Sequence, residues 1–291
     1  MSSPVVCIYH RNCLDGQTAA WIVRKRFPET TFIDADYMES LPEIERDATV
    51  YVVDFSYSGQ QLLDLCKQAR QVYVLDHHDK AIKDLEDFFG LGKEPAIGEP
   101  AVQMPNNLIM ILDRERSGAG ITWDFLYPNN SRPTIVDLTE DRDLWRFKYP
   151  ITKAYMRALA GIPMTMEAWD WASEQPSQKL VTRGESLIEA DEQNIRWILE
   201  NAVRMIEWQG YTVPLINCPK YMAGEVNNRF VNDYPFVISY YDGPEYRVYR
   251  FNSVKGGINV SELIGELNLG GGGHATSAGL KVKRDHPLAK L

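Results

Sequence analysis

Four polar residues capable of acid–base or metal chemistry follow one apolar run in the first third of the chain. The run is Val72-Tyr73-Val74-Leu75, and Asp76-His77-His78-Asp79 comes directly after it. Short continuous apolar runs of this kind predict buried β-strands. Parallel α/β sheets build their sites at the carboxyl ends of strands, so we expect these side chains at such an edge. An ordinary exposed turn after a strand is the alternative interpretation.

Two other apolar runs lead into the same kinds of side chain. Residues 5–9 precede His10 and Asp15, and residues 50–53 precede Asp54. Strands often end at Asp, so each case taken alone is weak. Three such strand ends between residues 5 and 79, separated by helical patterns, favour one shared site.

We therefore consider a centre in which five donors converge: His10, Asp15, Asp54, His77 and Asp141. Carboxylates with neutral imidazoles suit Mn²⁺ or Mg²⁺, and also Zn²⁺ or Fe²⁺. Asp54 could bridge two ions, which a two-metal hydrolytic site holds about 3.5–4 Å apart. Such ions would make hydroxide available for in-line attack on phosphorus. His78 could then hydrogen-bond the phosphate or protonate the leaving oxygen, with Asp76 orienting a neighbouring imidazole.

Two later segments carry further candidates. The acid-rich stretch 133–145 offers Asp137, Asp141 and Asp143 as ligands, and a solvated helix end is the competing interpretation. Gly270 to Gly273 and His274 form a glycine run whose backbone could approach a ligand closely, although a flexible spacer is the alternative. The run lacks the Lys and Ser/Thr of a phosphate-binding Walker loop, and it does not open a dinucleotide fold, so nicotinamide chemistry is disfavoured.

The elements that must position these residues alternate between strand and helix, which predicts an α/β fold with a parallel sheet. We expect a catalytic metal-binding domain over residues 1–175, a helical connector over 176–208 and a second, substrate-binding domain over 209–291. One long helical pattern runs from Arg183 to Glu207, and a later helix is expected over residues 260–267 with Ser261 as its cap. Four successive glycines should exclude a regular element at residues 270–273.

Composition limits the possible partners. The chain has 291 residues, 44% of them hydrophobic and 24% charged, and a net charge of −9. Such a charge disfavours long nucleic acid, so positive charge facing a phosphate must be local, and Arg116 is our candidate. Four scattered cysteines without CxxC spacing favour a reducing cytoplasm, and no apolar run approaches membrane-spanning length.

These motifs, in this order, resemble those of the DHH phosphoesterases, specifically the type that pairs a DHH domain with a DHHA1 domain. Asp76-His77-His78 matches the motif that names the family. Residues 10–16 are similar to the first motif, Val52-Val53-Asp54 to the second, and the acids near residue 141 to the fourth. The C-terminal motif is similar to residues 259–261 followed by residues 270–274 and 278–279.

The resemblance implies a Rossmann-like DHH domain, a smaller α/β DHHA1 domain and Mn²⁺-dependent hydrolysis with one or two ions, Mg²⁺ being the alternative. It implies metal ligation by His10, Asp15, Asp54, His77 and an acid near residue 141. We choose Asp141 because Trp145 follows at a plausible spacing. The resemblance also implies phosphate or nucleotide contacts from His78 and from the turn made by Gly271, Gly272, Gly273 and His274.

One departure bears on function. Cys13 occupies the position where the family's first motif usually carries an acid. The leading hypothesis is a phosphoesterase that acts on a short oligonucleotide, a dinucleotide or 3′-phosphoadenosine 5′-phosphate, with Asp54 and His78 as catalytic residues. The alternatives are a catalytically weakened nucleotide-binding regulator and a pyrophosphatase or exopolyphosphatase. We expect neither long duplex nucleic acid nor a membrane as a partner. A homodimer is compatible with this hypothesis.

Overall fold

The computed structural model describes residues 3–37, 39–91 and 104–290. The chain divides into two compact units, Met1–Leu187 and Ile188–Leu291. The boundary lies inside the long helix α8 (Ser177–Asn201), whereas the predicted domains ended on either side of a connector over residues 176–208.

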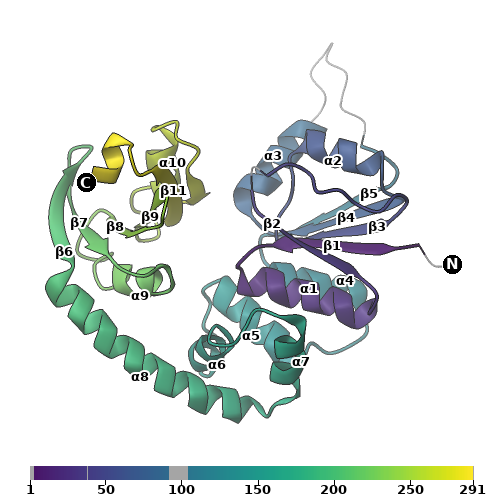
Figure 1. The fold of residues 1–291 in the computed structure, drawn as a ribbon, viewed down its shortest axis with the longest axis horizontal. Helices are drawn as coiled ribbons and strands as arrows, with labels where there is room; N and C mark the ends of the chain where they lie inside the picture. The colour runs from purple at the N-terminus through teal and green to yellow at the C-terminus, as the bar shows by residue number, and fades with distance from the viewer. Residues whose placement is uncertain (1–2, 38, 92–103, 291) are drawn as a thin grey trace. The chain divides into compact units, whose positions relative to one another are not determined.

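The first unit is built on a five-stranded parallel sheet with the strand order β2-β1-β3-β4-β5 (Figure 1). The strands are β1 (Val5–His10), β2 (Thr31–Ala35), β3 (Thr49–Val53), β4 (Gln71–Asp76) and β5 (Leu108–Leu112). Because β2 and β3 lie on opposite sides of β1, the chain changes direction across the sheet at β1 and β3. Ligand sites of open α/β sheets form at such switch points.

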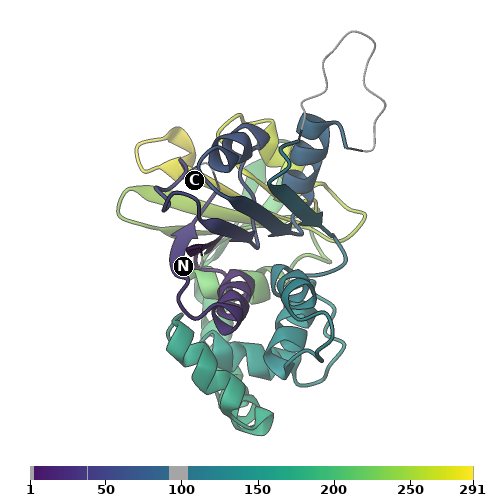
Figure 2. The same ribbon diagram turned by 90° about the vertical axis from the view of Figure 1, so that its right-hand side faces the viewer.

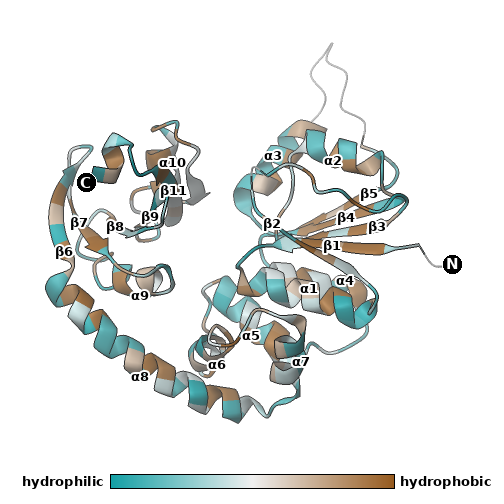
Figure 3. Ribbon diagram, in the orientation of Figure 1, coloured by the Kyte–Doolittle hydropathy of each residue, from teal (hydrophilic) through white to brown (hydrophobic). Residues whose placement is uncertain are grey.

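Helices cover both faces of this sheet. α2 (Gly59–Cys66) and α3 (Asp79–Phe89) lie on one face, and α1 (Leu14–Arg26) and α4 (Gly118–Leu126) on the other (Figures 1 and 2). The strands are strongly apolar, as a sheet buried on both faces requires (Figure 3). Three further helices follow. α5 (Thr134–Asp143) and α7 (Met166–Glu174) pack against α1, and α6 (Thr152–Leu159) packs against α5.

The second unit contains a mixed sheet in the order β10-β11-β9-β8-β7-β6, in which only the β7–β8 pair is parallel. Its strands are β6 (Val203–Trp208), β7 (Tyr211–Asn217), β8 (Val237–Asp242), β9 (Tyr246–Asn252), β10 (Gly272–His274) and β11 (Ser277–Lys283). The part of α8 from Ile188 onward also belongs to this unit, together with α9 (Ala223–Asn227), α10 (Val260–Gly265) and two short 3₁₀ turns, Lys220–Met222 and Pro287–Lys290. The predicted α/β class with two successive domains is confirmed.

Three local predictions were wrong. The helix expected through Glu207 ends at Asn201, because β6 pairs with β7 and the pairing overrides a helix-compatible pattern. Asn259, not Ser261, caps α10, since its side chain accepts from the backbone N–H groups of Ser261 and Glu262. The glycine run includes a short strand, β10, because its backbone pairs with β11; Gly270, at φ 75°, supplies the turn before it.

Candidate metal centre

The site residues of the first unit meet at the carboxyl ends of β1, β3 and β4. His10 is the last residue of β1, Asp54 follows β3, and His77 and His78 follow β4. Asp15, which the sequence also predicted as a ligand, joins them from the first turn of α1. Residues remote in sequence therefore converge because parallel strands end at the same edge.

Asp54 lies at the centre of this cluster. Its Oδ1 is 3.2 Å from Nε2 of His77, and its Oδ2 is 3.4 Å from Nδ1 of His10. The residue is fully buried and adopts a left-handed backbone conformation with φ 60°. Such strain in a non-glycine residue persists only where the surroundings fix it, and it is frequent in active sites.

Two sets of donor atoms could each hold a cation, and they share Asp54. One set is His10, Asp54 and His78, and the other is Asp15, Asp54 and His77; within each set the donor atoms lie within 4.8 Å of one another. The two oxygens of Asp54 thus point toward different imidazoles, as the bridging role suggested from the sequence requires.

The carboxylate of Asp15 is held by the beginning of α4. It accepts hydrogen bonds from the Ser117 hydroxyl at 2.8 Å and from the backbone N–H groups of Gly118 at 2.6 Å and Ala119 at 3.0 Å. The partial positive charge of a helix N-terminus favours a carboxylate here. Even so, burial and the nearby Asp54 and Asp143 raise the pKa of Asp15 well above its ordinary value.

Of the three acids that the segment 133–145 offered, Asp143 is the one at the cluster. Its Oδ2 lies 3.4 Å from Nε2 of His77. The structure does not bring the chosen Asp141 to the cluster; its carboxylate accepts from the backbone N–H groups of Lys148 and Tyr149 and from the Thr152 hydroxyl. Residues two apart on a helix point about 200° apart, so Asp141 and Asp143 could not face the same centre.

Histidines and carboxylates of the cluster shift one another's pKa values. Burial alone would lower the pKa of His77, but Asp54, Asp143 and Asp15 raise it to about 10. Burial would likewise raise the pKa of Asp54, yet the imidazoles of His10 and His77 next to its carboxylate hold it well below its usual value. Asp76 Oδ1 lies 2.8 Å from Nδ1 of His78 and accepts from the backbone N–H groups of His77 and His78, which orients the His78 ring.

These residues fit a divalent cation. Asp54 Oδ2 and His10 Nδ1 are buried atoms without a hydrogen-bond partner in the described part of the chain. Across residues 3–37, 39–91 and 104–290, no lysine or arginine forms an ion pair with Asp15 or Asp54, although both are buried. A buried carboxylate without a lysine or arginine partner is a candidate metal ligand. The oxygen and imidazole donors suit Mn²⁺ or Mg²⁺.

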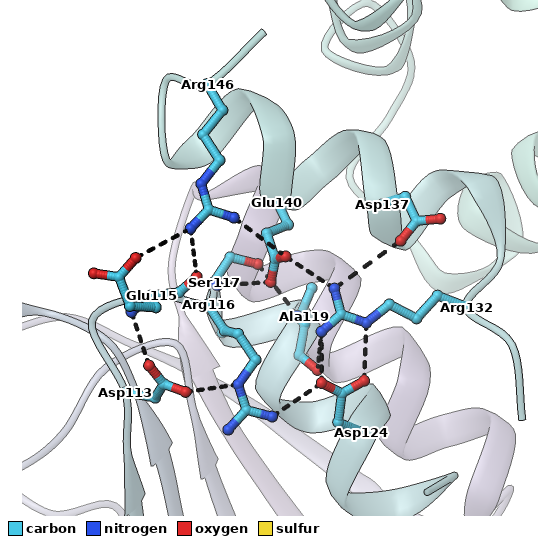
Figure 4. A network of polar contacts seen from close by, with 12 residues as sticks. Asp113, Glu115, Arg116, Ser117, Ala119, Asp124, Arg132, Asp137, Glu140 and Arg146 are labelled. Carbon is cyan, nitrogen blue, oxygen red and sulfur yellow. Dashed lines mark hydrogen bonds and ion pairs between the residues drawn. The ribbon is translucent and has the colours of Figure 1, made fainter. Parts of the chain in front are cut away.

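An ion-pair network surrounds the beginning of α4, where Ser117 donates to Asp15 (Figure 4). Glu140 accepts from the backbone N–H of Ser117 at 3.1 Å and from Arg132 at 2.9 Å, so it ties α5 to the start of α4. The predicted substrate residue Arg116 belongs to this network: its guanidinium donates to Asp113 at 2.7 Å and Asp124 at 2.9 Å. Its charge is thus already compensated, and a contact with substrate stays a prediction.

The remaining predicted substrate residues, Gly271, Gly272, Gly273 and His274, lie in the second unit. Gly272 lines a cavity of about 280 Å³ there, together with Arg250, Lys220 and Ser277. Arg250 donates to Ser277 at 3.1 Å and to Asn252 at 3.2 Å. Their role toward substrate also stays a prediction.

Sequence reasoning missed Tyr37 altogether. Its ring packs edge-to-face against His10 at 5.5 Å and His78 at 5.7 Å between centroids. Tyr37 lies in the loop that follows β2. An exposed loop tyrosine carries no distinguishing pattern, so only the structure could place it at the cluster.

All four cysteines are free thiols. Among the described residues, no helix is both long enough and apolar enough to cross a membrane.

Comparison with known proteins identifies the fold. No protein-family model matches the chain. The uncharacterized protein R106 of Acanthamoeba polyphaga mimivirus is 24% identical over 300 aligned residues, which cover 94% of this chain and 66% of that protein. The chain thus spans just under two thirds of the length of this relative.

Two solved structures resemble nearly the whole chain. The pGpG-specific phosphodiesterase PggH of Vibrio cholerae matches with a TM-score of 0.54 at 14% identity, over 97% of this chain and 94% of that one. RecJ of Thermus thermophilus, solved in complex with Mn²⁺, matches with a TM-score of 0.54 at 16% identity, over 95% of this chain and 49% of that one. With its parallel sheet, its second mixed sheet and its buried cluster of aspartates and histidines, the chain has the two-domain fold of the DHH phosphoesterases.

Proposed function

We propose that this protein is a metal-dependent phosphoesterase that hydrolyses a phosphodiester or phosphomonoester of a small nucleotide-type substrate. Short oligonucleotides, dinucleotides and 3′-phosphoadenosine 5′-phosphate are the substrates we favour. One observation carries the proposal: the buried Asp54 presents each of its oxygens to a different set of cation donors. The fold shared with PggH and RecJ supports the same class of reaction.

A divalent cation bound here would polarise a phosphoryl oxygen and lower the pKa of a coordinated water. His10 and Asp54 would hold one ion, and Asp15, Asp54 and His77 the other, with Asp143 next to His77 and with His78 beside the first ion. The fixed carboxylate of Asp15 and the strained backbone of Asp54 mean that the donors are in place before substrate arrives.

His78 is the proposed acid for the leaving oxygen or hydrogen-bond donor to the phosphate. Its Nδ1 is bonded to the buried carboxylate of Asp76, so Nε2 is the nitrogen that is directed away from this pair. Burial lowers the pKa of His78, but Asp76 and Asp54 outweigh this effect and raise it above the ordinary value. A raised pKa keeps a proton available near neutral pH.

The test is a substrate panel with the metal-stripped protein, with and without added Mn²⁺. Linear diadenylate, a short oligoribonucleotide, 3′-phosphoadenosine 5′-phosphate, pyrophosphate and polyphosphate are each assayed for phosphate or nucleotide release. We expect Mn²⁺-dependent release from a nucleotide, lost in Asp54→Asn and retained in the matched control Asp64→Asn, an exposed aspartate of α2. Turnover that survives in Asp54→Asn would refute the proposal, and release from pyrophosphate or polyphosphate alone would select that alternative.

A second candidate is a nucleotide-binding regulator on the same scaffold. Cys13 favours it, because burial and the charges of Asp54 and Asp143 raise the pKa of this thiol well above its ordinary value. A neutral thiol is a weaker ligand than the carboxylate expected at this position. Tight nucleotide binding without release under Mn²⁺, Mg²⁺ or Zn²⁺ would select this candidate over hydrolysis.

A further inference from the structure

Two partly exposed aromatic side chains are linked to the cluster of the first unit, one by contact in space and one by its position along the chain. Tyr37 is 40% exposed although its ring contacts the imidazoles of both His10 and His78. Trp145 is 45% exposed and lies two residues after Asp143, the carboxylate beside His77. The proposed function uses neither ring. Single exposed aromatics are ordinary, but two beside one polar centre call for an explanation.

The backbone that carries Trp145 is strained. Trp145 has φ 55° and Phe147 has φ 48°, a region that bulky side chains rarely enter. Asp141 holds this segment: its carbonyl accepts from the N–H of Arg146 at 2.9 Å and its carboxylate from the N–H of Lys148 at 2.8 Å. The buried Asp141 therefore fixes the loop that follows α5. Strain kept in place in this way is a recurring feature of ligand-contacting segments.

The indole ring is also oriented by its neighbours. The Arg142 guanidinium lies 4.1 Å from the centroid of the Trp145 ring, and Phe147 packs edge-to-face against it at 5.1 Å. A cation over an aromatic ring and a second ring at its edge restrict its rotation. Trp145 is thus an oriented aromatic surface that remains open to solvent, two residues along the chain from Asp143.

We propose that Tyr37 and Trp145 stack the nucleobases of the substrate on the two sides of the phosphate-binding centre. Tyr37 contacts the histidines of one donor set, and Trp145 follows the acid beside the other. Stacking of a base on an aromatic side chain tolerates any base and contributes roughly tenfold or more per base to affinity. The substrate class is then a nucleotide with bases on both sides of the scissile phosphate. This inference rests on the proposed function.

The experiment compares two substrates that differ only in their bases: linear diadenylate and its abasic analogue. The ratio of their kcat/KM values under Mn²⁺ is measured for the wild type, Trp145→Ala, Tyr37→Leu and Tyr37→Phe. Trp197→Ala is the matched control, because Trp197 is 63% exposed on α8. We expect the ratio to fall about tenfold in Trp145→Ala and Tyr37→Leu. It should stay within about twofold of the wild type in Tyr37→Phe, which keeps the stacking ring, and in Trp197→Ala, which leaves both Tyr37 and Trp145 in place.

The outcomes separate this inference from the proposed function. Equal ratios in Trp145→Ala and Trp197→Ala, with turnover in the wild type, would overturn the stacking role and leave the phosphoesterase standing. If the wild type hydrolyses neither substrate, the proposed function fails, and calorimetric binding of diadenylate then decides on stacking. A tenfold loss of affinity in Trp145→Ala would support it, and unchanged affinity would overturn it. Thermal midpoints confirm that each variant is folded.

Discussion

Gly118 at the start of α4 lies directly against Asp54. A Cβ atom on Gly118 would come within 2.6 Å of the Asp54 Cβ and 2.8 Å of its Cα, and 3.0 Å from the Asp15 carboxylate. The backbone of Asp54 could move away from such a contact only at a considerable cost in free energy. The close approach is what allows the N–H of Gly118 to bind Asp15 while Asp54 occupies the same small volume.

Gly118→Ala should therefore displace Asp54 and reduce activity strongly. A displacement of about 1 Å at a reacting centre can cost on the order of 10²-fold in rate. The control is Gly224→Ala in α9, where an added Cβ meets nothing within 4 Å. Steady-state kinetics and thermal midpoints of the two variants test this, and wild-type kinetics in Gly118→Ala would contradict the packing argument.

Metal should stabilise the protein independently of turnover. The carboxylates of Asp15, Asp54 and Asp143 repel one another in the absence of an ion, so a bound cation relieves a cost of the folded state. At a concentration of Mn²⁺ about 100 times its dissociation constant, stability should rise by about 2.7 kcal/mol. Calorimetry with and without chelator measures this, and the rise should be absent in Asp54→Asn but present in Asp64→Asn.

Substitutions of Asp143 and Asp141, two residues apart in α5, should have different effects, the first on metal binding and the second on stability. Asp143→Asn removes a carboxylate 3.4 Å from His77, and metal affinity or activity should fall by roughly 10- to 100-fold. Asp141→Asn disturbs buried hydrogen bonds to Lys148, Tyr149 and Thr152, and should cost about 1–3 kcal/mol of stability. Metal titration and thermal unfolding of both variants check this. A larger loss of metal affinity in Asp141→Asn would contradict the assignment.

These two acids also show how far sequence alone reaches. Strand ends could be predicted because apolar runs mark buried strands, and parallel strands must end at a common edge, which assembles His10, Asp54 and His77. The choice between Asp141 and Asp143 depends on the rotation of α5 about its axis, and an acid-rich helix end with few apolar residues does not specify that rotation. Tyr37 belongs to a loop, where no periodicity constrains the direction of a side chain.

The lack of long-range information in local sequence also explains why a helix was wrongly predicted at residues 203–207. Val203 and Ile206 fit a helical pattern with the residues before them, and only pairing with β7 makes the segment a strand. Long-range pairing is absent from local propensity. The four glycines at residues 270–273 were expected to exclude a regular element for the same kind of local reason, yet pairing with β11 makes residues 272–274 a strand.

The second unit should lose stability at acidic pH through Asp242. Arg247 donates two hydrogen bonds to its carboxylate, at 2.7 and 3.0 Å, and Arg284 lies 2.8 Å away; the bonds from Arg247 lower the pKa of Asp242 below its ordinary value. Because the folded pKa lies below the unfolded one, this carboxylate stabilises the fold above about pH 4. That contribution is lost as the pH falls through the folded pKa.

Asp242→Asn should accordingly destabilise the protein at pH 7 by on the order of 1 kcal/mol, since the carboxylate is partly exposed and solvent screens the pair. The difference from wild type should shrink as the pH is lowered from about 5 to about 3, because the wild-type carboxylate then becomes protonated and resembles the amide. Denaturant unfolding of both proteins across this range measures it, with the exposed Asp285→Asn as the control. A difference that stays constant with pH would mean that Asp242 acts through packing, because only an ionised carboxylate gives the pH dependence.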